Sequence, residues 1–179
     1  MALAGLLPAT PVIAADYLSL EAAQHAIFPQ VDQFSPCVVS LTEEQRRSIA
    51  ALAGPQPMRG MLQIWAAQRA GAAAGYFFID EVIGRQSLIT YAVGIDPAGV
   101  LTHIEILAYR ESHGGEIRNR NWRMQFEHRE GLEQLKFRTD IKNIAGATLS
   151  SEHVTQGVRW LVALWQTALR APLRTSTNP

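Results

Sequence analysis

The sequence predicts a single α+β domain, in which an antiparallel β-meander packs with helices and a long C-terminal helix follows. Three strand-like apolar runs in the middle of the chain are joined by connections of about four residues, too short for a parallel crossover. After them, apolar residues recur on one helical face, at Val154, Val158, Leu161, Trp165 and Ala168. A length of 179 residues with 47% hydrophobic residues suits one core of this kind.

The N-terminal third contains two helix signals. Residues 20–28 have the composition of a short helix, which Pro29 ends. Thr42 and Gln45 have the spacing of a capping box, which predicts a helix that begins there and continues to Leu52. The Gly- and Pro-rich residues 54–57 end it.

The middle of the chain predicts four strands. We expect them at residues 60–66, 76–83, 88–95 and 100–109, with a linker of small residues at 69–75 between the first two. Turns are expected at 84–87 and at 96–99. The second of these, Asp-Pro-Ala-Gly, fits a type I turn.

The last third turns helical. A loop is expected at residues 111–115, short helical structure at 116–126, and the long helix at 150–170, before Pro172. The chain therefore divides into four parts: a signal-peptide remnant (1–15), an N-terminal helical extension (16–58), the main domain (59–171) and a frayed tail (172–179).

Composition argues against several functional classes. A net charge of +0 removes the electrostatic attraction on which nucleic-acid binders depend. One cysteine, Cys37, cannot form a disulfide framework or a Cys-based metal site, and we expect it to be an idle thiol. No run of about 18 apolar residues indicates a membrane span. The five histidines lack metal-site spacing, and the hydrolase elbow and P-loop motifs are absent. Arg118, Arg120 and Arg123 form a local basic patch.

The first residues are consistent with export. An apolar stretch ends in Val-Ile-Ala-Ala, and the small residues at Ala14 and Ala15 suit signal-peptidase cleavage, although a basic beginning is missing. We therefore expect a periplasmic or extracytoplasmic location. The alternative is an ordinary apolar arm.

The segment before the long helix carries the chemistry. Gly146 and Ala147 leave the backbone approachable and Thr148 offers a hydroxyl, while Ser150 and Ser151 are expected to cap the helix. A helix N-terminus favours a nearby phosphate, so a phosphate ester on Thr148 would be stabilised there. The alternative is that Thr148 is itself an ordinary N-cap.

Several segments, in order, resemble the FMN-binding domain family found in the flavin-bearing subunits of Rnf-type complexes and of sodium-pumping NADH:quinone oxidoreductase. They are the strands at 75–84 and 89–99, the Glu-Ser-His-Gly loop beginning at Glu111, the Trp-Arg-Met-Gln-Phe segment at 122–126, and Ala-Gly-Ala-Thr-Leu-Ser at 145–150. The chain departs from the family at Ala145, commonly Ser or Thr, and at Lys142, commonly Asp.

The resemblance implies an electron-transfer flavoprotein whose FMN is joined to Thr148 by a phosphodiester. An ApbE-type flavin transferase would attach it, and a membrane-bound redox protein would exchange electrons with it. The cofactor-binding residues implied are Thr148, Gly146, Ala147, Ser150, Glu111, Ser112, Gly114 and Trp122. No catalytic residue or metal ligand is implied.

The resemblance also predicts geometry. Residues 111–115 and 122–126 should fold against the segment around Thr148 and form a cleft open on one side, with Trp122 or Phe126 as an aromatic wall. Two other functions stay open. One is a binding or adaptor module that keeps the fold without flavin, as the departures at Ala145 and Lys142 suggest. The other is a reductase with its own substrate site.

Overall fold

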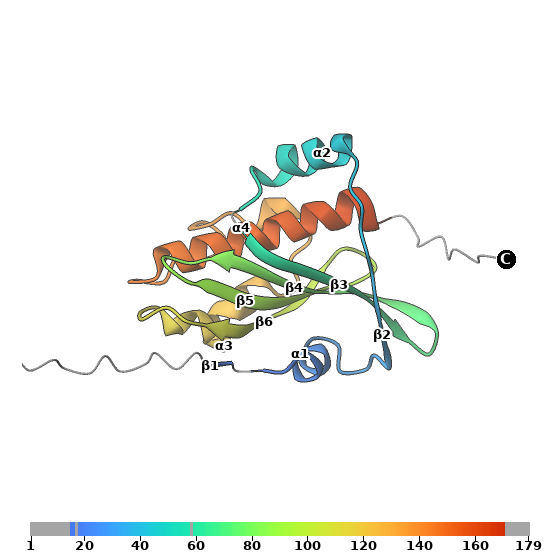
Figure 1. Cartoon of the computed structure of the whole chain (residues 1–179), viewed down its shortest axis with the longest axis horizontal. Helices are drawn as coiled ribbons and strands as arrows, with labels where there is room; N and C mark the ends of the chain where they lie inside the picture. Colours follow the sequence, from blue (N-terminus) through green and yellow to red (C-terminus); the bar gives the residue numbers. More distant parts are fainter. Residues whose placement is uncertain (1–14, 17, 58, 171–179) are drawn as a thin grey trace, which may run out of the picture.

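An antiparallel sheet forms the centre of the computed structural model in Figure 1, with strands in the order β1-β6-β5-β4-β3-β2. The strands are β1 (Ala15–Asp16), β2 (Gln33–Pro36), β3 (Arg59–Arg69), β4 (Ala72–Ile83), β5 (Leu88–Ile95) and β6 (Leu101–Tyr109). Strands β3 to β6 are neighbours in sequence and in space, and all pair antiparallel. The predicted α+β meander is therefore confirmed.

The structure describes residues 15–16, 18–57 and 59–170. The expected signal-peptide remnant lies almost wholly outside the described residues, and so does the expected tail at 172–179.

The turn between β5 and β6 forms as predicted. The backbone N–H of Gly99 donates to the carbonyl of Asp96 at 3.0 Å. The Asp96 carboxylate accepts from the backbone N–H groups of Ala98 and Val100, each at 2.9 Å. An aspartate at the first turn position satisfies these donors locally, which explains why this turn could be read from the sequence.

The predicted linker at 69–75 is wrong. Residues 72–75 belong to β4, and β3 and β4 are joined by a two-residue turn at Ala70 and Gly71, both with positive φ. Such turns match the right-handed twist of a hairpin. The alanine-rich stretch has low strand propensity, but backbone pairing with β3 overrides it.

The segment 16–58 contributes more than helices. Strand β2, which the sequence did not predict, pairs antiparallel with β3 and forms one edge of the sheet. Its last residue is Pro36, which an edge strand tolerates because one side of it makes no ladder hydrogen bonds. At the opposite edge, the two residues of β1 pair with β6.

Helices cover both faces of the sheet. On one face lie α4 (Thr148–Leu164) and α2 (Glu43–Ala53), and on the other lies α1 (Leu20–Ile27), as Figure 1 shows. Adjacent side chains of a strand point to opposite faces, so Phe78 packs under α4 and Phe77 packs under α1. The predicted capping box at Thr42 and Gln45 is present in α2.

The long helix begins at Thr148, two residues before the predicted start, and continues through a π-helical turn at Trp165–Leu169. The region before it holds short turns, namely η1 (Gly115–Arg118), α3 (Arg120–Arg123), η2 (Met124–Phe126) and η3 (Leu132–Gln134). Among the described residues, no helix is long and apolar enough to cross a membrane.

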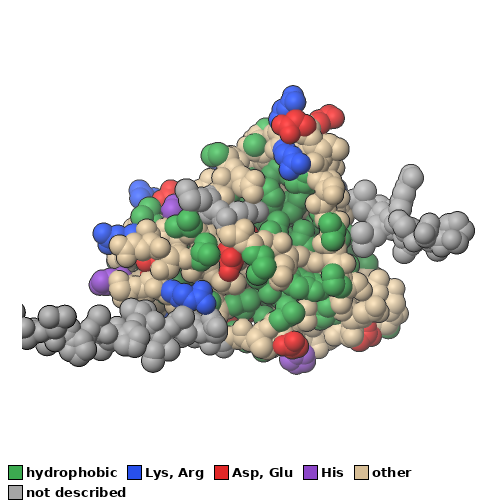
Figure 2. All heavy atoms as spheres, in the orientation of Figure 1, with side chains coloured by type: hydrophobic (Ala, Val, Ile, Leu, Met, Phe, Trp, Pro, Cys, Tyr) green, Lys and Arg blue, Asp and Glu red, His purple; other side chains and the backbone are tan. Residues whose placement is uncertain are grey.

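The two ends of the molecule differ in surface chemistry. In Figure 2, Lys and Arg side chains stand at the left end of the view, where α4 begins, and again at the top over α2, where Asp and Glu side chains lie beside them. Hydrophobic side chains gather over the right half, below α2. A polar and an apolar hollow correspond to this division.

Candidate functional site

Thr148 occupies the first helical position of α4, not the cap. The N-cap is Ala147, which has no side chain able to accept from the backbone, and no side-chain cap hydrogen bond is present. The interpretation of Thr148 as an ordinary N-cap is therefore wrong. Its hydroxyl oxygen instead accepts a hydrogen bond from the Asn143 side-chain amide at 3.1 Å.

The expectation that Ser150 and Ser151 cap the helix is also wrong, because both lie inside its first turn. The Ser150 hydroxyl is buried and lies 3.1 Å from the Tyr109 hydroxyl. The Ser151 hydroxyl lies 3.0 Å from the carbonyl of Ala147. Ser150 thus ties the start of α4 to β6, Ser151 bonds within the first turn of the helix, and Thr148 is half-buried.

A cleft of about 420 Å³ opens beside Thr148. This volume falls in the range of roughly 300–1,000 Å³ that is typical of small-molecule sites. Its lining is mostly polar and comes from three segments: Arg85, Gln86, Glu111, Ser112, His113, Gly146, Ala147, Thr148, Leu149 and Ser150. Of the predicted site residues, the structure thus brings Glu111, Ser112 and the 146–150 segment together.

Gly146 leaves the backbone beside Thr148 uncovered by other atoms. Its φ is +81°, a backbone conformation that favours glycine, and a Cβ built there would meet no atom within 4 Å. The backbone next to Thr148 is therefore open to an approaching group.

The loop at 111–115 packs against the segment around Thr148, as predicted. Gly114 has φ +85°, and a Cβ built on it would lie only 2.1 Å from the Cβ of Ala147. Tyr109 donates from its hydroxyl to the carbonyl of His113 at 2.6 Å. Burial raises the pKa of this tyrosine, so it stays a neutral donor. Sequence reasoning missed Tyr109, whose position at the end of a strand directly before the loop was the available signal.

Glu111 holds the opposite rim of the cleft. Its carboxylate accepts from the backbone N–H groups of Gln86 at 2.7 Å and Ser87 at 2.8 Å. A Cβ on Gly84 would lie 2.6 Å from the same carboxylate oxygen. This contact fixes the β4–β5 turn, and it places Arg85 at the rim, a residue that sequence reasoning did not single out.

Trp122 lies outside the cleft and holds the loop that leads to Thr148. It is 7% exposed, its indole N–H donates to the carbonyl of Lys142 at 2.8 Å, and its ring packs edge-on against Phe126. Neither ring lines the cleft, so the prediction of Trp122 or Phe126 as its aromatic wall is wrong, because both rings are buried in the hydrophobic core. The segment 122–126 thus folds against the loop that leads to Thr148.

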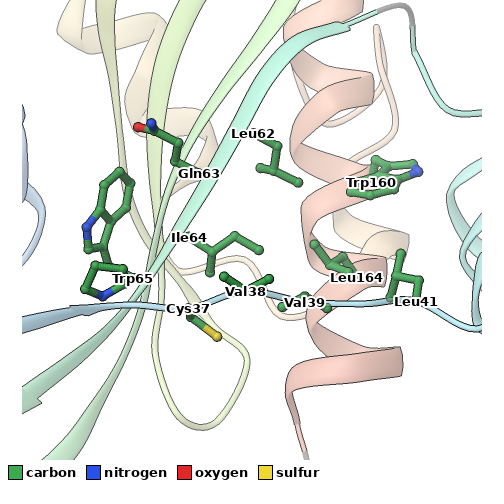
Figure 3. Close-up of a pocket in the computed structure, with 11 residues that line it drawn as sticks. Cys37, Val38, Val39, Leu41, Leu62, Gln63, Ile64, Trp65, Trp160 and Leu164 are labelled. Atoms are coloured by element: carbon green, nitrogen blue, oxygen red, sulfur yellow. The ribbon is translucent and has the colours of Figure 1, made fainter.

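A second hollow, an apolar groove of about 480 Å³, lies between the β2 segment, β3 and α4 (Figure 3). Its lining is Pro36, Cys37, Val38, Val39, Leu41, Leu62, Gln63, Ile64, Trp65, Trp160 and Leu164. Burial raises the pKa of the Cys37 thiol, which keeps it protonated and weakly nucleophilic.

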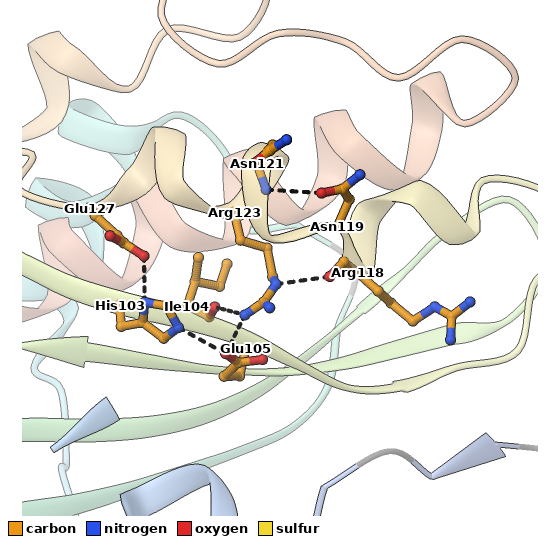
Figure 4. Close-up of polar contacts among 8 residues, drawn as sticks. All are labelled: His103, Ile104, Glu105, Arg118, Asn119, Asn121, Arg123 and Glu127. Atoms are coloured by element: carbon orange, nitrogen blue, oxygen red, sulfur yellow. Dashed lines mark hydrogen bonds and ion pairs between the residues drawn. The ribbon is translucent and has the colours of Figure 1, made fainter. Parts of the chain in front are cut away.

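An ionic cluster, none of whose members lines the cleft, ties α3 and η2 to β6 (Figure 4). His103 lies between two carboxylates, with Nε2 2.8 Å from Glu105 and Nδ1 2.5 Å from Glu127. Arg123 pairs with Glu105 and donates to the carbonyl of Ile104 at 2.9 Å. Arg123 therefore faces inward, and its assignment to a basic surface patch is wrong.

The cleft has the chemistry to hold a phosphate-linked group. The N-terminus of α4 carries unpaired backbone N–H groups and about half a positive charge. Arg85 and His113 add donors at the rim. Among the described residues, no group of three His, Cys, Asp or Glu side chains could hold a metal ion. A hydroxyl without a capping role at an anion-favouring position is the distinctive feature of the site.

Comparison with protein families identifies this region. The model of the FMN-binding domain matches residues 84–163. This segment belongs to the FMN-binding domain family. All the lining residues of the cleft fall within it, and membership implies a flavin-binding, electron-transfer role. A comparison with curated proteins found no match to the chain.

Proposed function

We propose that the protein is an exported electron-transfer flavoprotein that carries FMN on Thr148 through a phosphodiester, placed there by an ApbE-type flavin transferase. The observation that supports this most is the position of Thr148 at the first turn of α4. Its hydroxyl lines the cleft of the FMN-binding domain and caps nothing. Thr148 would hold the phosphate end, and Gly146 leaves room for it.

The surroundings of the threonine support the same proposal. A phosphate ester at this position would face the N-terminus of a 17-residue helix, which favours negative charge. Glu111 fixes the β4–β5 turn, and Gly114 packs against Ala147 at the start of α4. Bound FMN supplies the redox chemistry, and these residues orient it and leave one side open to a partner.

A covalent tether suits a protein that works outside the cytoplasm. A dissociated flavin would be lost by diffusion after export, whereas a phosphodiester keeps it on the chain. We therefore propose a periplasmic or extracytoplasmic location and a membrane-bound redox protein as partner. Fractionation of cells that express the full chain tests the location.

The attachment site is tested by expressing the chain with the transferase, denaturing it and measuring flavin fluorescence that stays with the polypeptide. We expect covalent flavin on the wild type and none on Thr148→Ala. Because Thr148 makes no cap, this change should alter stability by about 0.5 kcal/mol or less. Peptide mass spectrometry should place the modification on the segment that contains Thr148.

Thr42 offers a matched control, since it stands at the start of another helix and does cap it. Thr42→Ala should cost about 1 kcal/mol of stability and leave the flavin in place. Flavin that persists on Thr148→Ala would overturn the assignment. A wild type that takes up no covalent flavin would instead favour the binding or adaptor module.

A further inference from the structure

Both ends of the Asn143 side chain are engaged at the start of α4. Its amide N–H donates to the Thr148 hydroxyl oxygen at 3.1 Å, and its carbonyl oxygen accepts from the Ser151 hydroxyl at 3.0 Å. Ser151 is fully buried, and its one hydroxyl proton is shared between Asn143 and the carbonyls of Ala147 and Thr148 at 3.0 and 3.1 Å. The Asn143 amide thus bridges the preceding loop to the first helical turn.

The backbone beside Asn143 is held equally firmly. The Lys142 N–H donates to the side-chain carbonyl of Gln125 at 2.8 Å, and the Lys142 carbonyl accepts from the indole of Trp122 at 2.8 Å. Gln125 is in turn fixed by donating to the carbonyl of Trp122 at 3.0 Å. The loop therefore presents Asn143 to Thr148 from a rigid support.

These contacts determine the direction of the Thr148 hydroxyl. A threonine side chain has three staggered χ1 positions, and one of them brings Oγ1 within reach of the Asn143 amide. Because Asn143 donates this hydrogen bond, the proton of the hydroxyl points elsewhere, away from Asn143. The proton and the second lone pair of the Thr148 hydroxyl, in a residue that lines the cleft, are then not used by Asn143.

We propose that Asn143 is a positioning residue for flavin attachment, which orients the Thr148 hydroxyl toward the FMN phosphate of an incoming FAD. The inference rests on the proposed attachment site. In the reaction, Thr148 Oγ1 bonds to the phosphorus of the FMN half, and the pyrophosphate P–O bond breaks. AMP leaves with the bonding electrons, and the hydroxyl proton passes to a base of the transferase or to water. Nothing is oxidised or reduced.

The test is the initial rate of covalent flavin incorporation with limiting transferase and saturating FAD. Because misplacement of a reacting group by about 1 Å can cost as much as about a hundredfold in rate, we expect Asn143→Ala to react at least about tenfold more slowly than the wild type. Ser151→Ala, which removes the hydrogen bond to the Asn143 carbonyl oxygen, should slow the reaction by a smaller factor. Asn121→Ala, at an exposed asparagine on α3, is the matched control and should react at the wild-type rate.

A second readout needs neither flavin nor transferase. Three-bond NMR couplings to the Thr148 methyl carbon should show one χ1 position in the wild type and rotamer averaging in Asn143→Ala. A structural role elsewhere in the domain would leave these couplings unchanged. Circular dichroism should show the same helix content in both proteins.

The outcomes separate the two proposals. If Asn143→Ala takes up flavin at the wild-type rate, or keeps a single χ1 position, the role of Asn143 is overturned while the attachment site at Thr148 stands. If the wild type takes up no covalent flavin at Thr148, the attachment site falls and the role of Asn143 falls with it.

Discussion

The two hollows beside α4 are similar in volume and opposite in chemistry. The cleft at its N-terminus measures about 420 Å³, and the groove along its C-terminal half measures about 480 Å³. The cleft is lined by charged, hydroxyl-bearing and backbone polar groups. The groove is lined mainly by aliphatic side chains and two tryptophans (Figure 3). Size therefore does not identify the functional site in this molecule.

The difference lies in which side chains are committed to local structure. In the groove, the one nucleophile is Cys37, and burial raises its pKa. In the cleft, the hydroxyl of Thr148 has no capping role and stands at a helix N-terminus. The family match agrees, because it covers the whole cleft, whereas all the groove residues except Trp160 lie outside residues 84–163.

The two regions are also stabilised by different forces. The cleft is held by hydrogen bonds, among them those of Glu111 and Asn143, and an ionic cluster around His103 holds β6 to α3 and η2. The groove end is held by apolar burial, and among the residues that the structure describes no charged side chain lines the groove. The two ends should therefore respond to different perturbations.

The largest effect is expected from Trp160→Ala in the groove. Trp160 is 6% exposed, so its removal should cost about 3–5 kcal/mol of unfolding free energy. Flavin attachment at low temperature should be unchanged, because Thr148 lies three helical turns away on α4. Urea unfolding and denatured-gel fluorescence measure the two effects. Loss of flavin from a variant that is still folded would show that the two regions are coupled.

The next effect should come from Gly114, where a Cβ would collide with Ala147. With the penalty for φ +85°, Gly114→Ala should cost about 2–4 kcal/mol and reduce flavin attachment. Gly146→Ala is the matched comparison, because φ is +81° there and the space is open. It should cost about 1–2 kcal/mol from φ alone. Equal losses of stability in urea unfolding would mean that the packing of the 111–115 loop on α4 contributes nothing.

The sequence predicted what depends on local signals. The capping box at Thr42 and the turn at Asp96 satisfy their own backbone groups, and the helical spacing of α4 needs no distant partner. The position of the loop at 111–115 was predicted correctly because the family resemblance implied that this loop packs against the segment around Thr148. By contrast, β2 and the first residues of β4 depend on pairing with β3 and have weak strand propensity of their own.

The contacts that build the cleft are non-local, and most of them escaped prediction. The topology offered one signal, because an antiparallel meander places the β4–β5 turn and the C-terminal end of β6 at the same end of the strands. That arrangement brings Arg85 and Glu111 together across 26 positions of sequence. The role of Asn143 had no such signal, since it depends on the two-residue shift in the start of α4.

The smallest effect concerns pH and tests whether charge holds α3 and η2 to β6. A hydrogen bond to Glu105 raises the pKa of His103 above its usual 6.5, and Glu127 adds to this. Burial alone would raise the pKa of Glu105, but hydrogen bonds from His103 and Arg123 outweigh it and lower that pKa below its usual 4.5. The free energy of unfolding in urea is to be measured between about pH 6 and about pH 7.5, below the range in which Cys37 and Tyr109 titrate in the folded or the unfolded chain.

The sign of the effect follows from the direction of each shift. The raised pKa of His103 contributes stability that is complete below about pH 6.5 and is lost as the pH rises through the folded-state value. The lowered pKa of Glu105 contributes stability that is present above about pH 4.5 and is lost as the pH falls further. Stability from this cluster should therefore be greatest between these limits and should already decline between about pH 6.5 and about pH 7.5.

Two variants and one local measurement make this test specific to the His103 cluster. The decline should vanish in His103→Gln and persist in His25→Gln, a change at an exposed histidine on α1. Amide hydrogen exchange, corrected for the pH dependence of the intrinsic exchange rate, should show that residues 120–127 open more often at the higher pH. The reason is that deprotonated His103 has lost the positive charge that offsets the repulsion between Glu105 and Glu127. The amides of β2 beside the groove should be unaffected. If the decline persists in His103→Gln, or if β2 opens equally often, the pH sensitivity lies outside the His103 cluster. The cluster and the apolar groove would then not differ in their response to pH.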